Sequence, residues 1–587
     1  MAIVPSASQT FGEAAAPRQA LSRSGLYHPS RSIILQYGIA ILTLVLVAGP
    51  IVPLIYQSLL DKPLYESAQA TISLDNYTGL FTAGPFRTVV GNTFIFALLS
   101  TIISQFIGVI CAVLVGRTNV PGRKLFGDML LWPLLISHLI LSFGWFLIYG
   151  PAGYITIWVQ SLLGFQPWNL YSLGGMSLVA GISQAPLAAL YCLGSISLSD
   201  PSLEDAARTC GAKPARTLWS ITLPLLTPAI LYGSVLNFTS CLEMLSIPLI
   251  FGEPGGISLF TTFLYSEGVS SPRPNYGLVA TAAVLLLVIV TLLVFLQGRL
   301  LRNTRKYVTV GGKASRKRLF DLGNLRWVAF GFLSFYTFFF IILPLGILVL
   351  RAFTRFLTPL MPIWSLFTLD NFHNVLASEA NRRAIGNTIL IAVVGGIIAT
   401  VFITLITLVI HRSEFRFRRQ LEYVALFPRA IPGLIAGIGF FYMMVFIPPV
   451  GWLRNSVWIL ILAYTMRYIP TAFASLSPTL MQIGPDLDRS ARIMGADWLT
   501  AMRVVILKLM KPALFSCFAI LFIHFLKEYS IAIFLIAPGS EVIGTTLLQY
   551  WVLGDMGPLS ALATIQIVLT ILFITIVKKV LKVNIYD

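Results

Sequence analysis

The stretch LEDAARTCGA at residues 203–212 returns as LDRSARIMGA at residues 487–496, which is 284 positions further along the chain. Earlier in the chain the offset is 295, because LDNY at residues 74–77 returns as LDNF at residues 369–372. Constant offsets over long distances indicate an internal duplication. The first copy is therefore 11 residues longer than the second, and we expect the extra residues in a loop around 150–170.

The composition of the chain is that of a membrane protein. Apolar residues make up 57% of the 587 residues and charged residues only 11%, and the mean hydropathy is +0.83. Soluble proteins carry about a quarter charged residues, and apolar runs of 18 or more residues indicate membrane-spanning helices. These values exclude a soluble enzyme, a disordered chain and a free-standing nucleic-acid-binding protein.

Twelve apolar runs are long enough to cross a bilayer. Because backbone groups in lipid must be hydrogen-bonded within each segment, we expect these runs to be helices. The expected spans of the first copy are 33–56, 88–115, 126–149, 172–196, 225–250 and 277–297. Those of the second copy are 327–350, 386–410, 420–446, 456–477, 511–536 and 558–579. The sequence thus predicts an all-α polytopic membrane protein with about 12 transmembrane helices. Six spans per copy make two parallel repeats, which place a substrate path along their pseudo-symmetry axis.

Basic residues gather in alternate loops and predict the orientation of the chain. The connection 299–326 holds nine Lys and Arg residues against one acid. Loops of this kind stay in the cytoplasm, so both termini are predicted to be cytoplasmic. The loop 351–385, which carries four arginines, departs from the pattern. We divide the chain into a cytoplasmic N-terminal segment (1–32), a first repeat (33–298), a basic cytoplasmic linker (299–326) and a second repeat (327–587).

The stretch 203–212 lies in one of the predicted cytoplasmic loops and has the features of a short helix. Glu204 and Asp205 fall in its first turn, where the helix dipole favours anions. Ala206-Ala207 leaves a small surface that another protein can approach closely. Gly211 would end the helix, because glycine adopts a positive φ at little cost.

This spacing resembles the EAA loop of binding-protein-dependent ABC importer permeases, in which E-A-A-x-x-x-G is followed by I-x-L-P. The two EAA loops would span residues 200–224 and 484–508. By position, the resemblance assigns ATPase-coupling roles to Glu204, Asp205, Ala206, Ala207, Gly211, Leu223, Pro224, Asp488, Ser490, Ala491 and Gly495. The second loop departs from the pattern, because Ser490 replaces the central alanine and Lys508 stands where Pro224 stands.

The resemblance implies the fold of a type I ABC importer permease, with both halves fused in one chain. It implies a homodimer of cytoplasmic ABC ATPase subunits, which would carry ATP and magnesium, and an external (periplasmic) substrate-binding protein. It also implies a multi-pass protein of the bacterial cytoplasmic (inner) membrane. The chain itself is expected to be no enzyme and to hold no cofactor, because Gly311-Gly312-Lys313 lacks the earlier glycine of a phosphate-binding loop.

The residues around 526–530 and 537–541 resemble most the ferric iron branch of the fused permeases. The same machinery could instead carry thiamine, 2-aminoethylphosphonate, a polyamine or a phosphorylated organic anion. An ion-coupled secondary transporter is an alternative of a different class, but it would have no need of a docking helix in each half. No nucleic-acid partner is expected, because the basic linker lacks interleaved aromatic residues and fits contact with lipid headgroups.

Ionisable residues inside predicted spans are costly and seldom face lipid. Seven residues are of this kind: His138, Glu243, Arg429, Arg467, His524, Lys527 and Glu528. At the offset of 284, Glu243 matches Lys527 and lies one position from the match of Glu528. We therefore predict that Glu243, Lys527 and Glu528 line the substrate path. The alternative for Lys527 and Glu528 is an internal ion pair or a position at the end of a span, in contact with cytoplasmic water. The two histidines are expected to be hydrogen-bonded interior residues, and neither a metal site nor a catalytic site is predicted.

Overall fold

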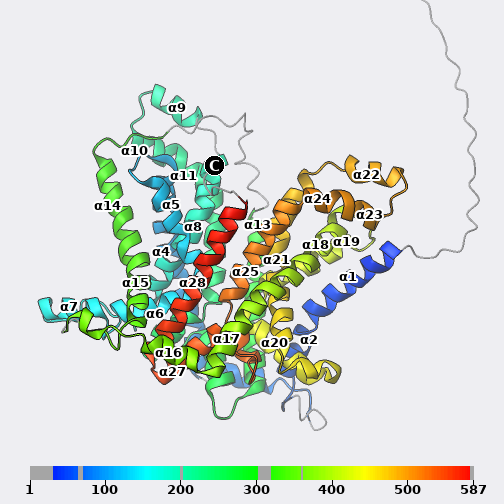
Figure 1. The fold of residues 1–587 in the computed structure, drawn as a ribbon, viewed down its shortest axis with the longest axis horizontal. Helices are drawn as coiled ribbons and strands as arrows, with labels where there is room; N and C mark the ends of the chain where they lie inside the picture. Colours follow the sequence, from blue (N-terminus) through cyan, green and yellow to red (C-terminus); the bar gives the residue numbers. More distant parts are fainter. Residues whose placement is uncertain are drawn as a thin grey trace, which may run out of the picture.

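The computed structural model describes residues 31–63, 70–82, 84–198, 202–301, 319–358 and 361–581, and this part of the chain is helical (Figure 1). Its pairings of β type are isolated bridges. The helices of the first repeat are α1 (Arg31–Ala48), α2 (Ile51–Ser58), α3 (Asp75–Thr82), α4 (Gly84–Arg117), α5 (Arg123–Leu135), α6 (His138–Tyr149), α7 (Tyr154–Leu163), α8 (Leu173–Leu198), α9 (Ser202–Thr209), α10 (Pro214–Thr217), α11 (Leu223–Leu242), α12 (Phe260–Tyr265) and α13 (Tyr276–Leu301).

The second repeat has a similar order of elements, with differences in how its helices are divided. Its helices are α14 (Leu325–Thr337), α15 (Leu343–Ala352), α16 (Asp370–Ala377), α17 (Glu379–Leu390), α18 (Gly396–Arg412), α19 (Arg418–Leu426), α20 (Gly433–Phe446), α21 (Val457–Gln482), α22 (Asp486–Ile493), α23 (Trp498–Ala501), α24 (Leu507–Leu509), α25 (Lys511–Lys527), α26 (Ala532–Leu535), α27 (Ile543–Leu553) and α28 (Met556–Leu581). The basic linker 299–326 lies mostly outside the described residues, as does most of the N-terminal segment 1–32.

Ten helical segments of the described chain are long and apolar enough to cross a membrane, and two bent helix pairs raise the number to twelve if each pair is one span. One pair, Arg418–Ala430 with Gly433–Phe446, is bent by 111°, and the other, Trp498–Leu509 with Lys511–Lys527, by 77°. The prediction of an all-α polytopic membrane protein with about 12 transmembrane helices is confirmed.

Two predicted spans, 126–149 and 420–446, were wrong as single helices. The first breaks between α5 and α6 at Ile136, which has an extended backbone with ψ of 151°. The second breaks before α20 at Ile431, where ψ is 108°. The two isoleucines are 295 positions apart, so the break belongs to the repeat. Pro432, which follows the second break, lacks the N–H that a continuous helix would need.

The predicted spans 225–250 and 511–536 were also wrong in extent. Helix α11 ends at Leu242 and helix α25 at Lys527, each followed by irregular chain. These ends correspond to within one residue at the offset of 284, so this interruption too is shared by the repeats. The extra residues of the first copy lie where the sequence placed them. The connection from α6 to α8 contains α7, whereas that from α20 to α21 holds only the 3₁₀ turn Pro448–Leu453.

The first span of each repeat packs against the other repeat. Helix α1 contacts α18, α19 and α21, and α2 contacts α20, whereas α14 contacts α5 and α15 contacts α6 (Figure 1). Glycines allow the close approach at both places. A Cβ at Gly144 would lie 2.3 Å from the carbonyl oxygen of Pro344, and a Cβ at Gly439 would lie 2.7 Å from that of Pro50. The two repeats are thus interlocked through their first spans.

We expect Gly144→Ala to lower the free energy of unfolding by about 1–3 kcal/mol, because its methyl group would press on the backbone of Pro344. Gly331→Ala on α14 is the control, since a methyl group there meets nothing within 4 Å. Thermal unfolding of the detergent-purified protein measures both variants. Equal unfolding midpoints for the two would contradict the interlocked packing.

Candidate functional site

The repeated stretch that opens the sequence forms the predicted helix in both copies. Helices α9 and α22 lie at the same end of the molecule, well apart from each other (Figure 1). Gly211 and Gly495 follow them with φ of 81° and 93°. The backbone N–H of Ala212 then donates to the Ala207 carbonyl at 3.0 Å, and the N–H of Ala496 to the Ala491 carbonyl at 3.1 Å. Both copies therefore end in the same glycine turn.

One acid of each helix, Glu204 in α9 and Asp488 in α22, is buried in an ion pair. In the first copy, Oε1 of Glu204 lies 3.5 Å from Nε of Arg117 and accepts a hydrogen bond of 2.9 Å from the Thr222 hydroxyl. In the second copy, Oδ1 of Asp488 lies 3.0 Å from Nη1 of Arg412. All four charged side chains are less than 10% exposed. Glu204 and Asp488 therefore attach their helices to the rest of the protein instead of presenting a charge at the surface.

The two arginines are the last residues of α4 and α18, which are the second spans of the repeats. They are 295 positions apart, whereas the acids are 284 apart. The EAA motif contains the acids but not the arginines, so the sequence analysis did not predict these ion pairs. The matched positions of Arg117 and Arg412 in the two repeats could have indicated them. Arg412 also donates to the carbonyl oxygens of Leu480 and Ile483 at the end of α21. Each helix is thus fixed to the end of a span.

The outer faces of α9 and α22 remain open and partly apolar. Leu203 and Leu487 are exposed at matched positions, and Ile493 and Met494 are 85% and 83% exposed. Among the other EAA residues, Ala206, Ser490 and Pro224 are exposed, and Asp205, Ala207, Leu223 and Ala491 are half-buried. Exposed apolar side chains beside a charged rim are typical of a protein-binding surface. This surface is defined here as the coupling face.

A π-helical turn follows α10 in the first copy, and another follows α23 in the second. The turns are Leu218–Thr222 and Met502–Ile506, which match residue for residue at the offset of 284. Such turns are rare and often mark functional positions in helices. Leu223 begins α11 directly after the first turn, and Lys508 lies in α24 after the second. Within the described residues, the two loops therefore share their glycine turn and their π-helical turn, although Lys508 replaces the proline.

A second candidate site lies where α11 and α25 are interrupted, and we call it the central cluster: Glu243, Arg467, Lys527 and Glu528. Nη2 of Arg467 on α21 lies 2.6 Å from Oε2 of Glu243, which directly follows α11. Nζ of Lys527 donates to the carbonyl oxygen of Leu134 at 2.6 Å. Both contacts cross from the second repeat to the first. The sequence grouped Glu243, Lys527 and Glu528 by depth, and the structure adds Arg467 as the partner of Glu243.

The two cations of the central cluster both reach a helix break. Arg467 donates to the carbonyl oxygens of Pro428 (3.3 Å) and Ile431 at the break before α20. Lys527 donates to Leu134 beside the break between α5 and α6. Carbonyl groups at a break lack helical partners and need donors inside a membrane. The cations satisfy these groups at equivalent places of the two repeats.

The remaining predicted charges have different surroundings. Glu528 accepts hydrogen bonds from the Tyr468 hydroxyl, from the Ser530 hydroxyl (2.6 Å) and from the Ser530 backbone N–H (2.9 Å). The ring of His524 lies 4.6 Å from that of Tyr468. Nε2 of His138 is buried and makes no hydrogen bond within the described part of the chain, contrary to the expectation for this side chain.

Arg429 lies apart from the central cluster, because its guanidinium contacts the Tyr232 hydroxyl at 3.2 Å on an exposed surface. Among the described residues, no three His, Cys, Asp or Glu side chains come together in a way that could hold a metal ion. The arrangement places paired charges, and carbonyl oxygens that accept hydrogen bonds from cations, between the two repeats.

The comparisons with known proteins match both repeats. The family described as "Binding-protein-dependent transport system inner membrane component" matches residues 79–306 and 411–583. The ferric transport system permease protein FbpB of Actinobacillus pleuropneumoniae is 25% identical over 497 residues, which cover 82% of this chain and 70% of that protein. The putative ferric transport system permease protein FbpB 1 of Haemophilus influenzae is 26% identical over 459 residues, covering 76% and 70%.

A crystal structure of a bacterial ABC transporter involved in the import of the acidic polysaccharide alginate contains a chain that is 19% identical to this one. The alignment covers 45% of this chain and 91% of that chain, with a TM-score of 0.39.

We expect Asp488→Asn to loosen α22, because it leaves the buried guanidinium of Arg412 without its carboxylate. Breaking a buried pair from one side costs about 3–5 kcal/mol. Hydrogen–deuterium exchange of residues 486–495 should therefore rise at least about tenfold, while exchange in α21 stays unchanged. Asp486→Asn is the control on the same helix, because Asp486 is exposed and its ion pair with Arg489 is long, at 4.0 Å. Equal exchange in the two variants would show that the ion pair does not hold the helix.

Proposed function

Because this chain belongs to the family of binding-protein-dependent transport system inner membrane components, we propose that it forms the membrane pathway of an ATP-driven importer of ferric iron. The chain is an ABC importer permease that carries the family's domain twice, and it is a multi-pass inner membrane protein. The choice of cargo rests on the relatives named for ferric transport, which align with 76–82% of this chain.

The coupling face is the part of the permease that we assign to the ATPase. Two matched helices at one end of the molecule fit two identical ATPase subunits, which would bind ATP and magnesium. Glu204 and Asp488 would transmit their movement, because each is tied by an arginine to the end of a second span. The exposed Ile493 and Met494 would contribute apolar area to the contact.

We assign the end that carries α9 and α22 to the cytoplasm. Helix α1 begins and helix α28 ends at this same end, so both termini would be cytoplasmic (Figure 1). The external binding protein would then dock at the opposite end, near α16 and α27. This orientation agrees with the basic residues of the linker 299–326.

The central cluster is the part that we assign to the substrate path and its gate. The pair Arg467–Glu243 and the contact Lys527–Leu134 hold the two repeats together between the two ends. Alternating access requires the repeats to separate here, so these contacts would break in another state of the cycle. When Arg467 or Lys527 leaves these contacts, the carbonyl and carboxylate oxygens that it held would be exposed to the path. Iron(III) is a hard cation and prefers such oxygen ligands.

We expect proteoliposomes that contain this permease, its ATPase and its binding protein to accumulate radioactive ferric iron when ATP is supplied to the ATPase. Thiamine, 2-aminoethylphosphonate and putrescine should not be taken up under the same conditions. Uptake of one of these compounds without iron would contradict the proposed cargo and leave the importer assignment intact.

The double variant Gly211→Val and Gly495→Val is the negative control of that assay. Valine at a positive φ is strained by about 1–3 kcal/mol at each position, which would displace both coupling helices. Iron uptake should be lost although the protein still inserts into the membrane. Unchanged uptake would remove the coupling face from the proposal.

We expect Glu243→Gln to raise ATP hydrolysis in the absence of cargo, because the pair with Arg467 ties the repeats together in this state. A charge-assisted hydrogen bond contributes about 1.5–3 kcal/mol, which corresponds to a shift of about 10–100-fold between states. Glu379→Gln is a matched control, since Glu379 pairs with Arg383 at the same 2.6 Å but on an exposed surface. Unchanged hydrolysis together with a lower unfolding temperature would make the central pair a structural contact only.

A further inference from the structure

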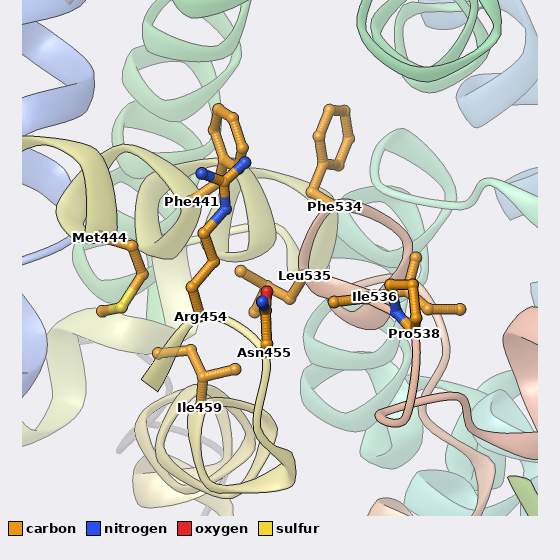
Figure 2. A pocket seen from close by; sticks show the side chains of 10 residues that line it. Phe441, Met444, Arg454, Asn455, Ile459, Phe534, Leu535, Ile536 and Pro538 are labelled. Atoms are coloured by element: carbon orange, nitrogen blue, oxygen red, sulfur yellow. The ribbon is translucent and has the colours of Figure 1, made fainter. Parts of the chain in front are cut away.

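A cavity of about 400 Å³ lies between α20, α26 and the start of α21 (Figure 2). It is lined by Phe441, Met444, Arg454, Asn455, Ile459, Phe534, Leu535, Ile536, Ala537 and Pro538. Helix α21 begins here and runs for 26 residues, about 39 Å, to the loop that holds α22. The cavity therefore lies on the side that we assign to the exterior.

One wall of the cavity carries an arginine whose charge is not neutralised. The guanidinium of Arg454 lies 5.6 Å from the centre of the Phe441 ring, and Figure 2 shows it extending along the cavity toward that ring. Arg454 and Asn455 are both exposed, and neither side chain makes an ion pair or hydrogen bond within the described ranges. A cation and an amide donor thus face the cavity next to apolar walls.

The first repeat has no such charge at the equivalent place. At the offset of 284, Arg454 and Asn455 correspond to Leu170 and Tyr171. Leu170 is only 4% exposed, and the Tyr171 ring lies 6.5 Å from the buried ring of Phe251. In the first repeat, a leucine and a tyrosine therefore pack at these positions. The arginine in the second repeat is not needed for packing and points to a ligand.

Two aromatic rings that line the cavity also contact the first repeat. Tyr276, the first residue of α13, stacks on Phe441 with the ring centres 5.9 Å apart. A Cβ at Gly268 would lie 2.8 Å from the ring of Phe534, so this ring packs closely on the first repeat as well. A molecule bound against Phe441 and Phe534 would contact side chains that rest on the other repeat.

We propose that this cavity binds a small oxyanion, a molecule that bears a carboxylate or phosphate group. Arg454 would pair with the anionic oxygens through the parallel N–H groups of its guanidinium, and Asn455 would donate a further hydrogen bond. The apolar part of the molecule would lie against Phe534 and Ile459. A volume of about 400 Å³ falls in the range of small-molecule sites. The site is independent of the cargo and of the central cluster.

Titration calorimetry of the full chain in lipid nanodiscs tests the proposal, with citrate and inorganic phosphate as the probes. At least one of the two should bind the unchanged protein at a single site. Arg454→Gln should raise the dissociation constant at least about tenfold, and Arg454→Lys should raise it less. Asn455→Trp should abolish binding by filling the cavity while the charge of Arg454 remains.

Arg355→Gln is the matched control, because Arg355 is another exposed arginine of the second repeat that does not line the cavity. It should bind the probe like the unchanged protein, and the unfolding temperature of Arg454→Gln should stay the same. Absence of binding to the unchanged protein, or equal binding by Arg454→Gln, overturns the proposal. The proposal also fails if neither probe binds and Arg454→Gln weakens only the docking of the external binding protein. Arg454 would then pair with an acidic side chain of that protein and not with a small molecule.

Discussion

The interior of a membrane offers no hydrogen-bond partners, so each interrupted helix in this protein needs donors from the protein itself. Arg467 and Lys527 provide them at two equivalent breaks, and Glu243 balances the charge of Arg467. The same requirement explains why the charges lie beside helix breaks: Glu243 and Lys527 stand where α11 and α25 end, and Arg467, within α21, reaches the break before α20. Because the partners come from different repeats, satisfying the breaks also joins the two halves of the molecule.

A similar principle holds the coupling helices. Each is a helix of eight residues, too short to be stable in isolation, and each carries an acid that is buried against an arginine at the end of a span. The exposed faces of α9 and α22 are thereby tied to the helix bundle. The interlocked first spans, with their glycine contacts at Gly144 and Gly439, add a second mechanical link between the repeats.

The repeats are equivalent in their framework and different in their surfaces. Helix breaks, glycine turns, buried ion pairs and one pair of π turns recur at matched positions. The central cluster is not symmetric, since Arg467 and Lys527 both come from the second repeat. The outer cavity with Arg454 is likewise confined to the second repeat, where the first has Leu170. The two repeats therefore agree where the backbone is interrupted or turns, and differ in the charged side chains of the central cluster and of the outer cavity.

The sequence by itself determined the helical membrane architecture, the duplication and the two EAA loops, because hydropathy and local spacing persist at a fixed offset along the chain. It also placed Glu243, Lys527 and Glu528 at one depth. Only the tertiary structure decided the breaks inside the spans and the pairing of Arg467 with Glu243. Arg467 and Glu243 are more than 200 positions apart and lie in different repeats. The repeat offset identifies equivalent positions of the two copies, but it does not say which residues of one copy contact the other.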